Sequence, residues 1–310
     1  RRRQAWRKGA AMKQLVILSG KGGTGKTSVA AAFAHLAAEG TPRIDAVLAD
    51  ADVDAANLEL VLKPKASSKE DFRSGLSAVI DTQACTGCGL CEEVCRFDAV
   101  AASNGTFAID DMACEGCAAC KYACPEEAIE MQEQLAGCWY RSQTRFGPLF
   151  HAALYPAQEN SGKLVTLIKQ HARLLAMDRE VPLVIVDGPP GIGCPVISAA
   201  SGADLALIVT EPTSAGVHDM KRILDTTAHF GISALVCINK ADLHAAAAED
   251  IAAYCRQHAL TIAGQIPFDL AVTEAMVAGE PVTAHQPKSP ASKALHRLWA
   301  SVAGALEGVP

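Results

Sequence analysis

Eight of the twelve cysteines lie between positions 85 and 124, in two runs with the same spacing, C-x2-C-x2-C-x3-C. The first run is Cys85, Cys88, Cys91 and Cys95, and the second, offset by 29 residues, is Cys114, Cys117, Cys120 and Cys124. A [4Fe–4S] cluster needs four thiolates on a compact cube, and three of them come from one tight loop with this spacing. The two runs therefore predict two such clusters.

The fourth cysteine of each run determines how the ligands are divided. In a two-cluster arrangement with this spacing, the fourth cysteine binds the cluster of the other run. We therefore expect one cluster on Cys85, Cys88, Cys91 and Cys124, and the other on Cys114, Cys117, Cys120 and Cys95. Zinc is the alternative, but it prefers two separated C-x2-C pairs around one ion, so two full quartets favour clusters. Arg96 follows Cys95 where Pro125 follows Cys124, which affects local geometry only.

A second motif lies near the start of the chain, between the apolar run LVIL (15–18) and a helical pattern from Thr27 to Glu39. It has the form G-x4-G-K-T, which predicts a phosphate-binding loop in this context. We expect its backbone amides to hold phosphates, Lys26 to reach the β- and γ-oxygens, and Thr27 to bind Mg²⁺. The predicted nucleotide-binding residues here are Gly20, Lys21, Gly22, Gly23, Thr24, Gly25, Lys26, Thr27 and Ser28.

Acidic residues follow two other apolar runs. Asp187 ends LVIVD (183–187), where it is placed to contact the hydrated Mg²⁺. Asp50 ends AVLAD (46–50) and begins DADVD, which also contains Asp52 and Asp54. Chemistry alone does not separate the roles of these three carboxylates, and Asp54 also fits a loop residue or a helix cap.

The elements around these motifs predict an α/β fold. Apolar runs at 15–18, 46–50, 183–187, 204–210, 234–239 and 261–267 alternate with helical patterns, which is typical of a doubly wound, mostly parallel sheet. Ligands bind at the carboxyl ends of such strands, where the glycine loop lies. We expect a P-loop ATPase domain over 12–78 and 132–310, interrupted by a small α+β unit over 79–131 that holds the clusters. Within 138–156 we expect two short strands.

Composition narrows the class of protein. The net charge is −6, and −11 for residues 12–310, which disfavours nucleic-acid binding because that depends on basic patches. No apolar run of about 18 residues is present to span a membrane. We expect a cytoplasmic protein that starts naturally at Met12, with no signal peptide and a disordered extension over 1–11. In that setting clustered cysteines indicate metal ligands, not disulfides.

KGGTGKT, DADVD and DGPPGIG together resemble the deviant-Walker P-loop ATPases (SIMIBI class), which include MinD, ParA, the Mrp-type cluster carriers and nitrogenase iron protein. With its cysteine segment, the chain is most similar to MinD-superfamily ATPases that contain an inserted bacterial ferredoxin domain. ENSGKLV (159–165) and IPFDLAVTEAMVAGEPV (266–282) also look like that group. The resemblance covers almost the whole chain outside the cysteine segment.

The resemblance implies a homodimer, or a pair with a homologous ATPase, that closes over two ATP molecules. Lys21 would contact the partner's nucleotide, Asp52 would position the attacking water, and Asp50 would support the Mg²⁺ shell. Asn239 would contact adenine together with Ile266, Pro267 and Asp269. Asn239-Lys240-Ala241-Asp242 also matches the N-K-x-D guanine-reading pattern, so GTP remains the alternative nucleotide.

Four cysteines remain outside the two runs. Cys237 and Cys255 lie in apolar patterns and are predicted to be core residues. Cys194 follows DGPPGIG at a predicted helix start, where a thiol is a better ligand or nucleophile, so it is a candidate extra thiol site as well as a candidate packed thiol. Cys138, beside Trp139, is less informative.

Three functions account for these features to different degrees. The first is an ATPase that couples nucleotide state to electron transfer through two [4Fe–4S] clusters, with a redox partner. The alternative is an ATP-dependent assembly or carrier factor that serves a metallocluster client protein. A positioning ATPase ranks last, because it leaves the cysteines unexplained and needs a basic amphipathic tail. The C-terminal helix has few cations, and its apolar face predicts packing on the sheet: Leu295, Leu298, Trp299, Val302 and Leu306.

Overall fold

The structure is a computed structural model that describes residues 6, 11–156, 158 and 160–309. The predicted N-terminal extension lies outside the described residues except for Trp6 and Ala11. Trp6 packs, partly buried, against the hydrophobic core. The chain forms two compact units, unit 1 (residues 1–69, 139–153 and 161–310) and unit 2 (residues 70–138 and 154–160).

A nine-stranded sheet, which includes β3 (Lys65–Ile80) and β6 (Ile129–Thr144), has the order β11-β10-β9-β1-β8-β2-β7-β6-β3. Parallel pairing joins β1 to β8 and β9, β2 to β7 and β8, and β10 to β9 and β11. The prediction of a mostly parallel α/β sheet is therefore confirmed, and each of the six predicted strands is present. The strands of this part are β1 (Lys13–Ser19), β2 (Ala46–Asp50), β7 (Gly147–Leu154), β8 (Leu183–Pro190), β9 (Leu205–Thr210), β10 (Ser233–Asn239) and β11 (Thr261–Ile266).

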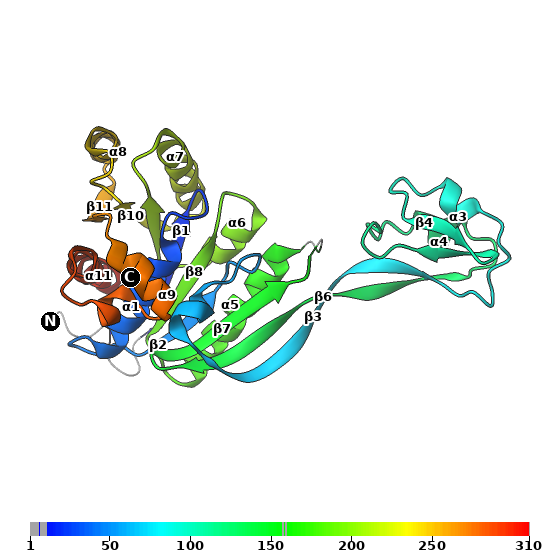
Figure 1. Ribbon diagram of the computed structural model, residues 1–310, viewed down its shortest axis with the longest axis horizontal. Coiled ribbons are helices and arrows are strands. Elements are labelled where there is room, and N and C mark those ends of the chain that lie inside the picture. The colour runs from blue at the N-terminus through cyan, green and yellow to red at the C-terminus, as the bar shows by residue number, and fades with distance from the viewer. Residues whose placement is uncertain (1–5, 7–10, 157, 159, 310) are drawn as a thin grey trace. The chain divides into compact units, whose positions relative to one another are not determined.

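Helices cover both faces of the parallel strands (Figure 1). Because side chains alternate along a strand, Leu15 and Ile17 of β1 face one layer while the equally buried Val16 and Leu18 face the other. The helices of unit 1 are α1 (Lys26–Glu39), α2 (Leu58–Leu62), α5 (Ser161–Asp178), α6 (Cys194–Ala200), α7 (Ser214–His229), α8 (Ala245–Gln257), α9 (Leu270–Ala278), α10 (Val282–His285) and α11 (Pro290–Gly308).

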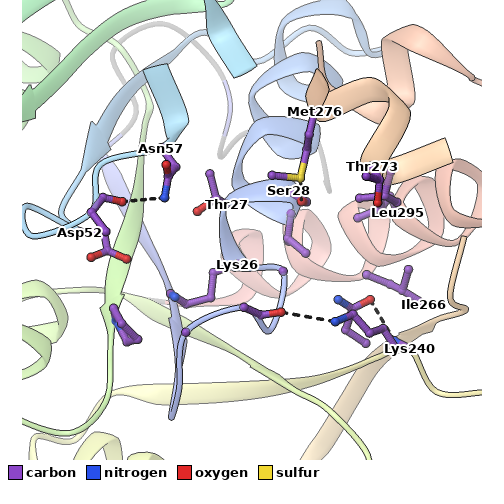
Figure 2. A pocket seen from close by; sticks show the side chains of 18 of the residues that line it. Lys26, Thr27, Ser28, Asp52, Asn57, Lys240, Ile266, Thr273, Met276 and Leu295 are labelled. Carbon is purple, nitrogen blue, oxygen red and sulfur yellow. Dashed lines mark hydrogen bonds between the residues drawn. The ribbon is translucent and has the colours of Figure 1, made fainter. Parts of the chain in front are cut away.

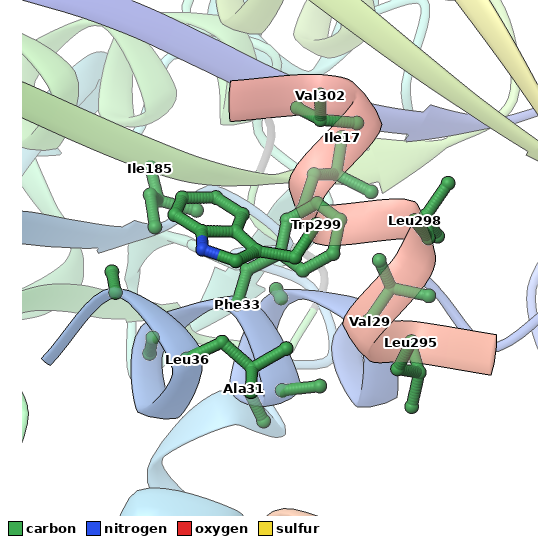
Figure 3. Packing of buried hydrophobic residues seen from close by; sticks show 14 of the residues in the cluster. Ile17, Val29, Ala31, Phe33, Leu36, Ile185, Leu295, Leu298, Trp299 and Val302 are labelled. Atoms are coloured by element: carbon green, nitrogen blue, oxygen red, sulfur yellow. The ribbon is translucent and has the colours of Figure 1, made fainter. Parts of the chain in front are cut away.

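The C-terminal helix α11 packs on the sheet beside α1. The rings of Phe33 and Trp299 lie 4.9 Å apart between these helices, over Ile17 and Ile185 of the sheet (Figure 3). All five residues of its predicted apolar face are buried, so the prediction of core packing is confirmed. No helix in the described part of the chain is long and apolar enough to cross a membrane.

On the face of the sheet opposite α1 and α11, a buried lysine links two helices through hydrogen bonds. Lys169 of α5 donates from Nζ to carbonyls at the C-terminus of α6, to Ser198, to Ala199 at 3.4 Å and to Ser201 at 2.6 Å. These carbonyls would otherwise lack partners, because the last turn of a helix has no intrahelical donors for them. Burial lowers the pKa of Lys169 to about 8, with a smaller contribution from Arg173.

Two strands of 16 residues each, β3 (Lys65–Ile80) and β6 (Ile129–Thr144), continue from unit 1 into unit 2. The prediction of two short strands within 138–156 is therefore wrong for the first of them, which begins at Ile129. Unit 2 also extends beyond the predicted segment 79–131, because these strands carry backbone pairing past the point where the composition changes. Its other elements are α3 (Leu90–Glu93), β4 (Val100–Ser103), β5 (Thr106–Ile109) and α4 (Ala119–Ala123), with β4 and β5 antiparallel.

Candidate functional site

The glycine loop joins β1 to α1 at the carboxyl edge of the sheet. Gly23 and Gly25 have positive φ angles of 77° and 92°, which side chains rarely adopt. Gly25 precedes the first residue of α1, Lys26, whose side chain is buried. The first backbone N–H groups of a helix lack intrahelical acceptors, so this loop presents donors and positive potential to an anion.

Two long-range contacts hold the loop in place. A Cβ atom at Gly20 would overlap the Cβ atom of Asp219 on α7. Asn239, at the end of β10, donates from Nδ2 to the carbonyl of Thr24 at 2.8 Å, and a Cβ atom at Gly25 would overlap that Nδ2. The glycines therefore permit close approach by residues about 200 positions away in sequence.

A cavity of about 550 Å³ opens beside the loop, within unit 1 (Figure 2). Of the predicted site residues, it is lined by Gly22, Gly23, Gly25, Lys26, Thr27, Ser28, Asp52, Asn239, Ile266, Pro267 and Asp269. Gly20, Lys21, Thr24, Asp50 and Asp187 are not among its lining residues. Sequence reasoning did not assign the other lining residues to the site. Pro189 and Pro190 belong to DGPPGIG, and Phe268, Val272, Thr273 and Met276 belong to the 266–282 segment, both quoted only for their resemblance, whereas Asn57, Pro195 and Leu295 lie outside those segments.

Asp50 and Asp187 are partners in the parallel register of β2 and β8. The Asp50 carboxylate accepts hydrogen bonds from the backbone N–H groups of Asp52, at 3.1 Å, and Leu58, at 3.0 Å. It therefore shapes the loop that carries Asp52. Burial, followed by the charge of Asp187, holds the pKa of Asp50 well above its ordinary value.

Asp187 differs from Asp50 in having no hydrogen-bond partner for either buried carboxylate oxygen among the described residues. Burial raises the pKa of Asp187 to about 6, and the charge of Lys26 and the nearby hydroxyl of Thr27 oppose that rise. An unpartnered buried carboxylate costs free energy unless a cation or a donor satisfies it. Its oxygens are the ligands that Mg²⁺ prefers, so the donor set fits a hydrated Mg²⁺ ion.

Asp52 faces the cavity from the loop after β2, across from Lys26 (Figure 2). Burial raises the pKa of Asp52, while the positive charge of Lys26 lowers it. A carboxylate in this position can accept a hydrogen bond from a water molecule in the cavity. Asp54 is exposed and also lines the cavity.

Glu211 forms ion pairs with two lysines beside the glycine loop. Its carboxylate lies 3.2 Å from Nζ of Lys21 and 2.5 Å from Nζ of Lys240. Burial alone raises the pKa of Glu211, but hydrogen bonds from Lys240 and Lys21 outweigh it, so the pKa is lowered. Glu211 is therefore charged at neutral pH. No motif indicated this residue.

The far end of the cavity is formed by the segment after β11. Asp269 accepts from the backbone N–H groups of Ala271 and Ala291, both at 3.0 Å, so its carboxylate caps α9 and helps anchor α11. Asp242, the last residue of N-K-x-D, accepts from the backbone N–H of Phe268 at 2.6 Å. Asp242 is not among the described residues that line the cavity.

Unit 2 contains two small cavities, each lined by four cysteines. One is lined by Cys85, Cys88, Cys91 and Cys124, and the other by Cys95, Cys114, Cys117 and Cys120. These are the same two quartets in which the fourth cysteine of each run crosses to the other. Each run bends through two positive φ angles, at Gly87 and Gly89 and at Gly116 and Ala118.

Among the described residues, no group of three or more Cys, His, Asp or Glu side chains is arranged to hold a metal ion. A single zinc ion requires every sulfur at about 2.3 Å from one point. The thiols instead line cavities shared with apolar residues such as Ile80, Phe107 and Met131. Four thiols about one cavity are the donor set that a [4Fe–4S] cluster would need.

The four remaining cysteines divide into buried and exposed. Cys237 and Cys255 are fully buried, as predicted, and burial raises the pKa of Cys237 to about 12. Cys138 is also buried. Cys194 is exposed and is the first residue of α6, directly after the segment that follows Asp187.

The glycine loop, the lysine and the carboxylates at the carboxyl edge of a parallel sheet define a P-loop nucleotide-binding protein. Residues 15–282 match the family described as CobQ/CobB/MinD/ParA nucleotide binding domain. The chain belongs to this family.

Several known proteins are similar to this chain. An uncharacterized protein of Methanocaldococcus jannaschii is 37% identical over 229 residues, covering 73% of this chain and 78% of that protein. An uncharacterized ATP-binding protein of the same organism is 27% identical over 293 residues, covering 94% of this chain and 88% of that protein. The septum site-determining protein MinD of Pyrococcus horikoshii OT3, solved with Mg-ADP, has the same fold, with a TM-score of 0.52 at 19% identity over 94% of this chain and 96% of that one.

Proposed function

We propose that the protein binds and hydrolyses Mg-ATP at the P-loop cavity, holds two [4Fe–4S] clusters in unit 2, and uses nucleotide state to control electron flow. The observation that carries the proposal is the division of eight cysteines into two cavities of four. Family membership supports the nucleotide site, since residues 15–282 match a nucleotide-binding family.

At the nucleotide site, the backbone amides of the glycine loop bind the phosphates and Lys26 neutralises them. Thr27 and Asp187 would hold the hydrated Mg²⁺, because the buried Asp187 carboxylate lies near Lys26 and the Thr27 hydroxyl and has no other interaction of ordinary hydrogen-bond geometry among the described residues. Asp52 positions the attacking water from its place on the cavity wall. Asp50 acts indirectly, since its oxygens already hold the backbone of the Asp52 loop.

Adenine is the base that the cavity supports best. A guanine-reading aspartate must present its carboxylate to the base, but Asp242 accepts a hydrogen bond from Phe268 and does not line the cavity. The remaining wall is apolar, with Ile266, Pro267 and Met276 available to pack on a base. Asn239 faces the cavity while supporting Thr24.

In unit 2, Cys85, Cys88, Cys91 and Cys124 would hold one cluster, and Cys114, Cys117, Cys120 and Cys95 the other. A bound [4Fe–4S] cluster accepts and releases a single electron. Burial raises the pKa of Cys91 and of Cys120, so in the metal-free protein these two side chains are thiols, and ligation requires loss of their protons.

Coupling is supported by a chain of hydrogen bonds within unit 1 that starts at the nucleotide site. The Asp50 carboxylate accepts a hydrogen bond from the backbone N–H of Leu58, the first residue of α2. The carboxylate of the next residue, Glu59, lies 2.9 Å from Nδ1 of His151 on β7. The Nε2 atom of His151 is 2.9 Å from Oγ of Ser142 on β6. Strand β6 then continues into unit 2. Movement of the Asp52 loop on hydrolysis would therefore be transmitted to a strand that enters the cysteine unit.

The proposed active form is a homodimer, or a pair with a homologous ATPase. Lys21 would leave Glu211 and contact the partner's nucleotide. The Lys21 side chain is 36% exposed, whereas that of Glu211 is 11% exposed, so Lys21 is the member of this ion pair that a partner subunit can reach.

A cluster-assembly or carrier role is the second candidate. The exposed thiol of Cys194 favours it, because this residue follows the Asp187 segment and its neighbour Pro195 lines the nucleotide cavity. In that role a client metalloprotein replaces the redox partner.

The test is the ATPase rate of anaerobically purified, iron-replete protein, oxidised and dithionite-reduced. We expect a rate that depends on redox state and loses that dependence in Cys88→Ala and Cys117→Ala. Cys194→Ala is the matched control, because it removes an exposed cysteine outside both quartets. Equal rates in both redox states would rule out the coupling, and loss of client activation in Cys194→Ala alone would favour the assembly role.

A further inference from the structure

The two halves of the cysteine unit have the same backbone but different surfaces. Positions related by the 29-residue offset have matching φ angles: 72° and 66° at Gly87 and Gly116, and 52° and 51° at Asp98 and Glu127. The exposed cysteine of each quartet is also equivalent, Cys88 in one and Cys117 in the other. Differences between equivalent side chains are therefore not consequences of the fold.

At Cys117 the surroundings are apolar. The cavity that contains this residue is also lined by Phe97, which is 42% exposed. Leu76 of β3, 44% exposed, lies against Gly116, since a Cβ atom there would meet the Leu76 Cβ at 3.3 Å. Glu115 lines the same cavity and is exposed. We call Leu76, Phe97, Glu115 and Cys117 the Cys117 face.

At Cys88 the equivalent positions are polar. Glu126 stands at the position equivalent to Phe97 and lines the other cavity. Thr86 stands at the position equivalent to Glu115. Where Leu76 approaches Gly116, the carbonyl of Gly105 in the β4–β5 turn approaches Gly87, 2.7 Å from a Cβ atom built there. Leu90, 40% exposed, and Val94, 37% exposed, lie in the run that contains Cys88, but neither lines the Cys88 cavity. Among the described residues that line the two cavities, an exposed large apolar side chain, Phe97, occurs at Cys117 and not at Cys88.

The charge of the chain is concentrated in this unit. Residues 70–138 contain 13 acidic and three basic side chains, a net charge of −10, whereas the whole chain has −6. The rest of the chain is therefore positive by 4. Apolar side chains within a strongly acidic surface suit a partner with an apolar patch ringed by basic residues, because opposite charges accelerate encounter and the apolar contact stabilises the complex.

We propose that the Cys117 face is the docking surface for a basic redox partner protein, and that the Cys88 side is not. The inference rests on the proposed function, since it assigns the site where that partner meets the cysteine unit. It gives the two quartets different roles, with the Cys114, Cys117, Cys120 and Cys95 quartet next to the partner.

Oxidised cytochrome c, a basic one-electron acceptor, is the probe. The full chain, iron-replete and reduced, is mixed with it in a stopped-flow instrument over a range of ionic strengths. We expect the second-order rate constant to fall steeply with salt, because exposed charges are screened beyond about 10 Å at 0.1 M. Glu115→Lys should lower the low-salt rate constant about five-fold. Glu126→Lys, the same charge change on the Cys88 side, should lower it by less than about two-fold.

A second pair of variants tests the apolar contact. Leu76→Ser should reduce the rate at high salt, where steering is weak, and Leu90→Ser, 40% exposed on α3, should not. Iron content and the visible spectrum are checked for each variant, so that a damaged quartet is not mistaken for lost docking. Equal effects of Glu115→Lys and Glu126→Lys, or no salt dependence, would overturn the proposal.

Binding without electron transfer separates this inference from the proposed function. Calorimetric titration of cytochrome c at low ionic strength requires no cluster. If the protein holds no iron, the proposed function fails. The docking face would still be supported if Glu115→Lys bound cytochrome c more weakly than Glu126→Lys. If iron is present and the two variants bind alike, the docking face fails and the proposed function stands.

Discussion

The Nζ atom of Lys21 lies 3.2 Å from the carboxylate of Glu211, which also receives Nζ of Lys240 at 2.5 Å. Lys21 is the lysine that the family resemblance directs toward a partner's nucleotide, and in this structure it is held within its own chain. Glu211 would therefore oppose the proposed dimer until Lys21 is released.

Glu211→Gln removes the ion pair with Lys21, so the free energy needed to release Lys21 should fall by about 1 kcal/mol relative to the parent. We therefore expect ATP-dependent dimerisation and the ATPase rate to rise about five-fold. Light scattering with and without ATP, together with steady-state ATPase assays, measures both. Glu249→Gln is the control, because it breaks an exposed ion pair with Arg256 on α8. A rate in Glu211→Gln equal to or below that of the parent would contradict the holding role.

The pKa of Asp187 predicts a pH dependence of stability. Burial raises this pKa to about 6 from its ordinary 3.8, so between these values the folded protein binds more protons than the unfolded chain. The free energy of unfolding of the nucleotide-free protein should therefore fall as pH rises from about 4 to 6, by about 2 kcal/mol from this residue. Affinity for Mg²⁺ should rise over the same range, because the ion requires the charged carboxylate.

Urea unfolding at several pH values tests this, with Asp187→Asn compared against the parent. Asn cannot titrate, so the variant should lose the part of the decline that Asp187 contributes and keep the part from Asp50, whose pKa is also raised by burial, whereas the exposed Asp45→Asn should keep the whole decline. Parallel curves for Asp187→Asn and the parent would show that Asp187 does not titrate in this range.

Glycine at position 20 is required by close approach to another element. Gly20→Ala would place a Cβ atom into Asp219 of α7, and we expect a loss of about 2 kcal/mol in unfolding free energy. Gly22→Ala is the matched control, since no atom lies within 4 Å of a Cβ there. Thermal unfolding without nucleotide measures both, and equal destabilisation would contradict the packing argument.

Base selectivity should follow the contacts of Asn239 and Asp242. We expect ATP to bind at least about ten-fold more tightly than GTP, and Asn239→Ala to weaken ATP about five-fold by releasing the Thr24 carbonyl. Asp242→Asn should leave the preference for ATP in place, because Asp242 contacts Phe268 and not the cavity. Competition between fluorescent ADP and each triphosphate gives the affinities. Preference for GTP that is lost in Asp242→Asn would reverse the assignment.

Lys169 should contribute to stability through the end of α6. Lys169→Met removes the donor for three carbonyls and should lower the unfolding free energy by about 2 kcal/mol. Lys163→Met on the exposed side of the same helix is the control. Chemical unfolding curves provide the comparison, and a loss no larger than that of Lys163→Met would show that water satisfies the carbonyls equally well.

Sequence predicted the parallel strands, their order of appearance and the glycine loop, because these depend on local patterns. Runs such as LVIVD at 183–187 contain the apolar side chains of a strand buried on both faces, and G-x4-G-K-T is complete within eight residues. It misjudged β6, because a strand that leaves one compact unit and enters another has no single apolar pattern along its length.

The site was only partly predictable for the same reason. Motif residues were found, but Met276, in a segment quoted only for its resemblance, and Leu295, predicted only to pack in the core, also line the cavity. Glu211 lies between a strand and a helix without a motif, and its importance comes from the lysines that meet it.

By itself, then, the sequence determined the chemistry available to this protein: a phosphate-binding loop, carboxylates at strand ends, and two cysteine quartets with a fixed spacing. These follow from neighbours along the chain, whose separation the backbone limits to a few ångströms per residue. Only the tertiary structure decided which carboxylate stays unpartnered, how Lys21 is held, and how the surfaces around Cys88 and Cys117 differ. Those properties depend on burial and on contacts between residues far apart in sequence, which packing alone brings together.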